Sequence, residues 1–118
     1  MLKLNTPSTK LEQDLYNAID IQTAKLQNVI VTEDTLTVDL IDGRTISVPL
    51  AWYPRLIHGT LEERNNWRFI GDKEGIHWTN LDEDISIENL LSGKPSGESQ
   101  RSFKRWLDKR SNSLTNSN

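Results

Sequence analysis

The apolar positions of the chain recur with two different periods, and the first of these is helical. Between residues 9 and 25, apolar side chains return every three or four positions, and Thr9 and Glu12 have the spacing of a capping box. Gln22 is the one polar residue that interrupts this stripe. The apolar positions are Leu11, Leu15, Ala18, Ile19 and Leu26. The pattern predicts an amphipathic helix over residues 9–25 that either covers a face of a sheet or binds a partner.

From residue 28 to residue 48 the period changes to two, which is typical of strands with one buried face. One alternating run covers residues 28–33, and two more flank the Asp42-Gly43 pair. Asp-Gly between such runs is a strong hairpin signal, because glycine adopts the positive φ that the turn requires. Pro49 ends the last run, since proline cannot donate a ladder hydrogen bond. We therefore expect a three-stranded antiparallel meander.

The second half of the chain predicts short helices around one more hairpin. Thr60 and Glu63 form another capping box, and Ser86 has the position of an N-cap. The expected elements are a helical turn at 51–57, a helix that opens at the capping box and runs through 66, and a hairpin over 67–78. They continue with an acidic extended segment at 81–86, a helix at 87–91, a linker at 94–97 and a helix at 98–110.

Together these elements indicate an α+β fold. It consists of a small antiparallel sheet, made of the meander plus the second hairpin, with short helices and a separate N-terminal amphipathic helix. A length of 118 residues is typical of one domain. We expect an N-terminal extension over 1–26, a single domain over 27–110 and a disordered polar tail over 111–118.

Composition excludes several classes of protein. Without cysteine there are no disulfides and no thiolate metal sites. No run of 18 apolar residues is present, and the N-terminus lacks the pattern of a signal peptide. We therefore expect a cytoplasmic protein with no membrane span.

The charges are unevenly distributed, although the net charge is only −3. Acidic residues gather at 82–88 and basic residues at 94–110. The two groups either pair with each other inside the molecule or bind a charged partner. The acidic strip is Asp82, Glu83 and Asp84, and the basic helix carries Arg101, Lys104, Arg105, Lys109 and Arg110.

Arginines beside aromatic residues form the most promising binding surface. Such an arginine can hold a carboxylate or phosphate with two hydrogen bonds while stacking on the ring. The same residues could instead tie the short helices to the sheet through Asp42, Glu62 or Glu63. We predict that a protein partner binds at Arg44, Trp52, Tyr53, Arg55, Asp82, Glu83 and Asp84.

Nothing in the sequence predicts a catalytic or metal-binding residue. His58 and His77 are the only histidines and have no ligand-like spacing. The nucleophile elbow and both glycine-rich nucleotide-binding motifs are missing. We expect no cofactor. An enzyme that uses His77, Asp82 and Asp84 is the least favoured interpretation.

Three motifs in the same order resemble one bacterial family. They are DGR-x-ISVPL-x-WYPRL, EER-x-xW and GIHW-x-x-LDEDIS, and the resemblance runs from about residue 29 to residue 107. The family is the domain of unknown function twenty-four forty-two. The resemblance implies a small α+β domain without an agreed activity. Some longer relatives carry a helix-turn-helix module, and some sit beside a small partner family for which toxin–antitoxin pairing is suspected.

Our first functional hypothesis is a non-enzymatic protein-interaction or regulatory domain, with an antitoxin-like or adaptor role as its specific version. A second copy of the chain is another candidate partner, bound through the N-terminal helix or a sheet edge. The alternative is a nucleic-acid-binding regulator that uses the basic helix. The acidic net charge and the lack of a reading motif argue against nucleic acid as the partner.

Overall fold

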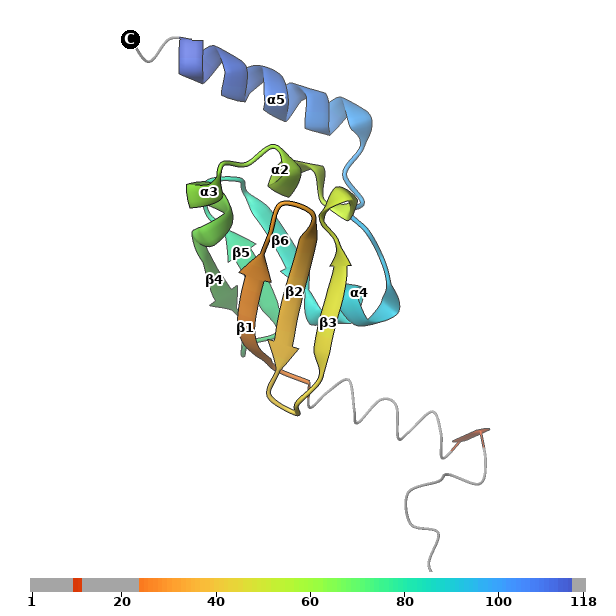
Figure 1. Ribbon diagram of the computed structural model, residues 1–118. Helices are drawn as coiled ribbons and strands as arrows, with labels where there is room; N and C mark the ends of the chain where they lie inside the picture. Colours follow the sequence, from red (N-terminus) through yellow and green to blue (C-terminus); the bar gives the residue numbers. More distant parts are fainter. Residues whose placement is uncertain (1–9, 12–23, 116–118) are drawn as a thin grey trace, which may run out of the picture.

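The computed structural model describes residues 10–11 and 24–115. Two three-stranded antiparallel sheets form the body, and short helices connect them (Figure 1). The strands are β1 (Leu26–Val31), β2 (Thr35–Leu40), β3 (Thr45–Pro49), β4 (Trp67–Ile70), β5 (Gly75–Trp78) and β6 (Glu83–Ser86). The helices are η1 (Leu50–Trp52), α2 (Pro54–Ile57), α3 (Leu61–Asn65), α4 (Ile87–Ser92) and α5 (Gln100–Thr115). The predicted α+β class is confirmed.

The first sheet is the predicted meander, in the order β1-β2-β3. Gly43 has a φ of 100°, and the Asp42 side chain accepts the backbone N–H of Arg44 at 3.1 Å. These two features close the turn between β2 and β3. Thr37 and Ser47 face each other across the same pair of strands and share a side-chain hydrogen bond of 2.7 Å. The alternating pattern therefore predicted both the strands and their turn.

The second sheet contains one strand more than the sequence indicated. The predicted hairpin is β4 and β5, with Trp67 opposite Trp78. The acidic extended segment is β6, which pairs antiparallel with β5. Three of the four residues of β6 are polar, and only Ile85 is fully buried. A strand with one apolar residue gives no periodic signal, so one sheet was expected where there are two.

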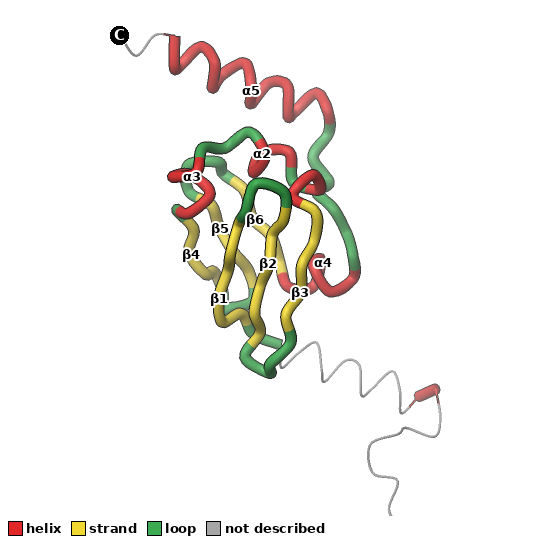
Figure 2. Tube along the Cα trace, viewed as in Figure 1, coloured by secondary structure: helices red, strands yellow, loops and turns green. Residues whose placement is uncertain are grey.

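The two sheets lie face to face, with β1–β3 in front of β4–β6 in Figure 2. Their inward side chains form one apolar core that includes Leu36 from the first sheet and Trp78 from the second, both fully buried. The indole of Trp78 donates to the carbonyl of Arg64 at 3.0 Å. The core therefore also holds α3 in place.

The helices α2 and α3 lie over one end of the sheets, and α5 lies beyond them (Figure 1). The Thr60–Glu63 capping box that opens α3 is present in both directions. Ser86 caps α4, whose C-terminus ends at Gly93 in the left-handed conformation. The predicted capping box and the predicted Ser86 cap are confirmed.

Most of the predicted N-terminal helix, 9–25, lies outside the described residues. Residues 24 and 25 are not helical, and β1 begins at Leu26 rather than at 28. Leu26, which was assigned to the helical stripe, is instead fully buried in the core. At the other end, α5 continues to Thr115 through part of the expected disordered tail. No glycine or proline follows Arg110 to stop it.

Candidate functional site

A cavity of about 360 Å³ opens where three segments of the chain meet. They are the start of α2, the β5–β6 turn with β6, and the linker that leads into α5. The lining side chains used below are Tyr53, Arg55, Asp82, Glu83, Asp84 and Glu98. Five of the seven predicted partner-binding residues therefore lie together at one site.

Tyr53 forms the inner wall of the cavity. Only 3% of its surface is exposed, and its hydroxyl lies 3.5 Å from the carbonyl of Lys94. Burial and the nearby Glu83 carboxyl raise the pKa of the Tyr53 phenol. Pro54 follows at the first position of α2, where its fixed φ is already helical. The proline therefore restricts the backbone from which the side chains of Tyr53 and Arg55 project.

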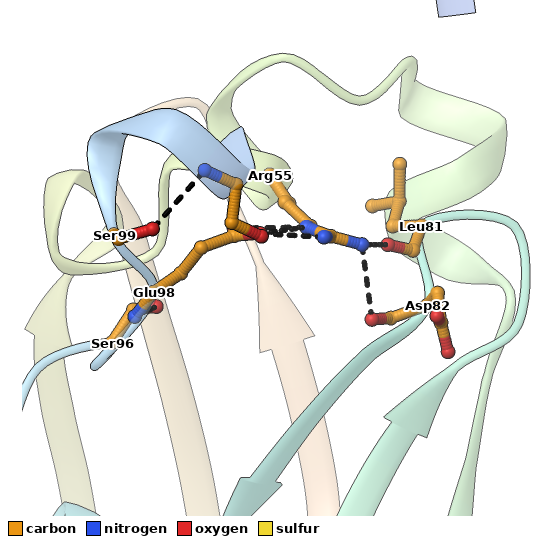
Figure 3. Close-up of polar contacts among 7 residues, drawn as sticks. Arg55, Leu81, Asp82, Ser96, Glu98 and Ser99 are labelled. Carbon is orange, nitrogen blue, oxygen red and sulfur yellow. Dashed lines mark hydrogen bonds and ion pairs between the residues drawn. The ribbon is translucent and has the colours of Figure 1, made fainter. Parts of the chain in front are cut away.

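Arg55 holds the three walls together (Figure 3). Its Nε and Nη2 donate to the Glu98 carboxylate at 2.9 and 2.5 Å. Its Nη1 donates to the carbonyl oxygens of Leu81 and Asp82, at 3.1 and 3.3 Å. The hydrogen bonds from Arg55 to Glu98 lower the pKa of the Glu98 carboxyl. Most donors of Arg55 are used inside the molecule, so this residue builds the site and leaves little for a ligand.

Glu83 is the unusual group of the cavity. It lies opposite Trp78 in the ladder, and its Oε1 atom is buried without a hydrogen-bond partner among the described residues. Burial raises the pKa of the Glu83 carboxyl to about 7, and the charges of Glu98 and Asp84 act in the same direction. Arg55 opposes this shift. Near neutral pH the carboxyl is thus divided between its neutral and ionised forms.

The neighbouring acids are more exposed. Oδ1 of Asp84 accepts a hydrogen bond from Nδ1–H of His77 at 2.5 Å, and the two residues are opposite in the ladder. Asp82 occupies the turn, with a φ of 49° in the left-handed region. His77 is not among the lining residues. Of the three residues of the enzyme hypothesis, Asp82 and Asp84 line the cavity, and His77 contacts Asp84 from outside the lining.

Two predicted binding residues lie away from the cavity. Arg44 pairs with Asp42 at 2.7 Å within the turn of the first hairpin. Trp52 packs against the core, and its carbonyl accepts the N–H of Ser96 at 3.0 Å. Neither residue lines the site.

Glu98, Ser102 and Asn89 line the cavity but were not predicted as site residues. Glu98 meets Arg55 from 43 positions along the chain, and Ser102 donates to the Glu98 carboxylate at 2.7 Å. The only sequence signal near these residues is Ser99, whose hydroxyl accepts the N–H of Ser102 as the N-cap of α5. A cap predicts the start of α5 but not its partner.

The basic helix α5 divides into two sets of side chains. Arg110 faces the body, binds the Glu63 carboxylate and lies 5.3 Å from the centre of the Trp106 ring. This ion pair lowers the pKa of Glu63 to about 2. The remaining cations are exposed, and within residues 24–112 no hydrogen bond or ion pair engages their side chains. They are Arg101, Lys104, Arg105 and Lys109.

A second groove, of about 260 Å³, lies beside the first cavity. It is lined by Arg105, Lys109 and Trp106, and it shares Arg55, Asp82 and Ser102 with the first cavity. Within residues 24–115 no ion pair joins the acidic strip to the α5 cations. An acidic cavity and a basic groove therefore lie side by side, instead of neutralising each other by direct contact.

Two further features were searched for among the described residues. No group of three or more histidine, cysteine, aspartate or glutamate side chains there could hold a metal ion. No helix in that part of the chain is long and apolar enough to cross a bilayer.

Comparisons with known proteins identify relatives of unknown function. The model of one family, described as "Protein of unknown function (DUF2442)", matches residues 26–96. No curated protein matches the chain. A crystal structure of a protein of unknown function from Rhodospirillum rubrum is 22% identical, with a TM-score of 0.56 over 65% of this chain and 95% of that one. An uncharacterized Chromobacterium violaceum protein, solved by NMR, is 15% identical, with a TM-score of 0.57 over 88% and 95% of the two chains. These likenesses show a shared fold.

Proposed function

The chain belongs to the DUF2442 family, whose match covers most of the cavity walls, and we propose that it is a non-enzymatic protein-interaction domain that binds its partner at this cavity. The observation that carries the proposal is the convergence of Tyr53, Arg55 and the acidic strip on one surface. An antitoxin-like or adaptor role is the specific version, and it rests on analogy with relatives.

The polarity of the walls supports a protein as the ligand. Sites for small molecules are predominantly apolar with a few polar groups. Here four carboxyls and one guanidinium line the walls, and the apolar contributions come from Tyr53, Ile85 and Pro95. Charged walls of this kind are typical of the rim of a protein interface, where they select the partner.

The non-enzymatic part of the proposal rests on what surrounds Glu83. A carboxyl with a pKa of about 7 suits acid–base catalysis. Catalysis also needs a group that binds or polarises the reacting atoms, and the lining cation Arg55 is already bound to Glu98. A binding role explains the same carboxyl without any further group.

Blocking the cavity tests this function. Gly97 lines the site, its backbone is outside the left-handed region, and a Cβ there meets nothing within 4 Å. Gly97→Trp should therefore fold and obstruct the cavity. Glu62→Trp, at an exposed site on α3, is the matched control.

The measurement is quantitative affinity capture from cells of the source organism, with full-length protein. A stoichiometric partner that the wild type and Glu62→Trp retain and that Gly97→Trp loses would support the proposal. Equal capture by all three proteins would contradict binding at the cavity.

The second candidate function is nucleic-acid binding through α5. One observation favours it: Arg101, Lys104, Arg105 and Lys109 are all exposed, whereas Arg110 is committed to Glu63. Four phosphate contacts would give a log–log salt slope of about −3 to −4. No binding to duplex or single strands at low salt would eliminate this function.

Two further proposals concern the oligomeric state and the cellular location of the protein. A second copy of the chain is an alternative partner, bound at the edge of a sheet. Mass measurement of the purified protein over a range of concentrations tests it. A cytoplasmic location accords with the absence of cysteine, and fractionation of cells tests that proposal.

A further inference from the structure

The cavity and the neighbouring groove have opposite charge, and this determines what a partner must present. We infer that the partner segment carries a basic side chain, which enters the cavity, and an acidic side chain, which lies against Arg105 and Lys109. This inference rests on the proposed function and deepens it, because it specifies the chemistry of the bound segment.

The cavity selects a cation because its available groups are acceptors. With all groups ionised, its lining carries four negative charges and the single positive charge of Arg55. Arg55 already donates to Glu98, Leu81 and Asp82, so it offers little to an incoming anion. The carboxyls of Asp82, Glu83 and Asp84 remain on the surface of the cavity.

Glu83 gives this selection a specific point of contact. Its buried Oε1 has no partner among the described residues, and a buried acceptor without a donor is unfavourable. A guanidinium or ammonium group that enters the cavity beside the Glu83 carboxyl stabilises its ionised form. The cavity volume of about 360 Å³ is at the lower end of known ligand sites, which accords with one side chain.

The groove selects an anion by the same reasoning. Arg105 and Lys109 are four residues apart on α5, so they lie on one face of the helix. Among the described residues, no carboxylate forms an ion pair with either side chain. The Trp106 ring between them is already covered by Arg55 and Arg110, at 5.0 and 5.3 Å from its centre. A carboxylate placed on these cations can therefore form a bidentate bond to Arg105.

A chain of phosphates fits this surface poorly. A polyanion that followed the groove would bring phosphates against Asp82, which is shared by the groove and the cavity. Like charges in such contact are repulsive and reduce affinity. A peptide segment with separated opposite charges meets both surfaces favourably.

The test uses synthetic probe peptides and the full-length protein. Each probe is a glycine-serine peptide that holds one arginine and one glutamate, separated by two to five residues. Matched probes replace the arginine, the glutamate or both by glutamine. Binding is followed by chemical-shift changes of the backbone amides at low salt. The protein variants are Glu83→Gln and the double variant Arg105→Glu/Lys109→Glu.

We expect the doubly charged probe to bind best and to shift amides both near Glu83 and near Arg105. Glu83→Gln should weaken the binding of arginine-containing probes about tenfold or more. The double variant should bind a probe whose glutamate is replaced by a second arginine more tightly than the original probe. If α5 had only a structural role, the variant would not reverse the order of the two affinities. Glu33→Gln, at an exposed turn residue, should change nothing.

Equal binding of all probes, or tighter binding of an oligonucleotide than of any peptide, would overturn the inference. The proposed function would survive that result if wild-type protein still captures a cellular partner that the Gly97→Trp variant loses. The function itself would fail if the Gly97→Trp variant retained its partner, whatever the peptides do.

Discussion

Glu83→Gln should make the protein more stable at neutral pH, which is opposite to the usual effect of changing a buried residue. In the folded protein, burial raises the pKa of this carboxyl to about 7 from its ordinary 4.5. Ionised Glu83 is therefore unfavourable in the folded state. Its raised pKa means that the folded protein binds more protons than the unfolded chain between these two values. Stability from this group is present below about pH 4.5 and is lost as the pH rises through 7.

The magnitude follows from the size of the shift. A rise of the pKa from 4.5 to about 7 corresponds to at most about 3.4 kcal/mol, at about 1.36 kcal/mol for each pH unit. Part of the Glu83 side chain remains in contact with solvent, and screening reduces the effect to about 1–2 kcal/mol. Glutamine has nearly the same shape and no charge, so it removes this loss. The free energy of unfolding of the variant, relative to wild type, should rise by about that amount between pH 4 and pH 8.

Urea unfolding followed by tryptophan fluorescence gives this difference at each pH, because the effects of titrating groups distant from Glu83 cancel between the two proteins. Glu33→Gln, which changes an exposed carboxyl at the turn between β1 and β2, should give a difference independent of pH. If the curves of wild type and Glu83→Gln run parallel over the whole range, Glu83 is not the strained carboxyl described above. Glu83 would then not be the group that selects a cation in the cavity.

Three other substitutions test the framework of the site. Glu63→Gln should lower the free energy of unfolding at neutral pH by about 1 kcal/mol after allowance for screening, because Arg110 lowers the pKa of Glu63 to about 2. This loss should vanish as the pH falls from about 4.5 to 2. Unfolding measured over that pH range should show the wild-type and variant curves converging, and a constant gap between them would contradict the ion pair. Gly59→Ala should destabilise the protein by about 1–3 kcal/mol, since a Cβ there would lie 2.9 Å from a methyl of Leu81; thermal unfolding measures this, with Gly97→Ala as a neutral control. Trp78→Ala should cost about 3–5 kcal/mol, because the ring is fully buried between the sheets; a cost below about 1 kcal/mol would mean that Trp78 is not central to the core.

Local patterns predicted the local structure well. The Asp42-Gly43 turn, the Thr60–Glu63 capping box and the Ser86 cap are each set by residues within a few positions of one another. Their hydrogen bonds depend on the spacing of the residues, so the sequence alone is sufficient to predict them.

Long-range pairing was harder to predict. The strand β6 has one buried residue and three polar ones, so its pairing with β5 is decided by the packing of Ile85. The side chain of Glu98 meets Arg55 from the linker before α5, and no periodicity connects two residues that are 43 positions apart. The acidic strip and Arg55 were recognised as candidates because of their residue types. Their convergence depends on the turn at Asp82 and the path of the linker.

Photo-crosslinking inside living cells tests the central claim most directly. A photoreactive amino acid would replace Asn89, which is exposed at the wall of the cavity, or Glu62 on α3 as the control. We expect a discrete crosslinked product from position 89 that is absent at position 62 and that disappears when Gly97→Trp is added. No product from position 89, or equal products from both positions, would contradict the assignment of this cavity as the place where a partner protein binds.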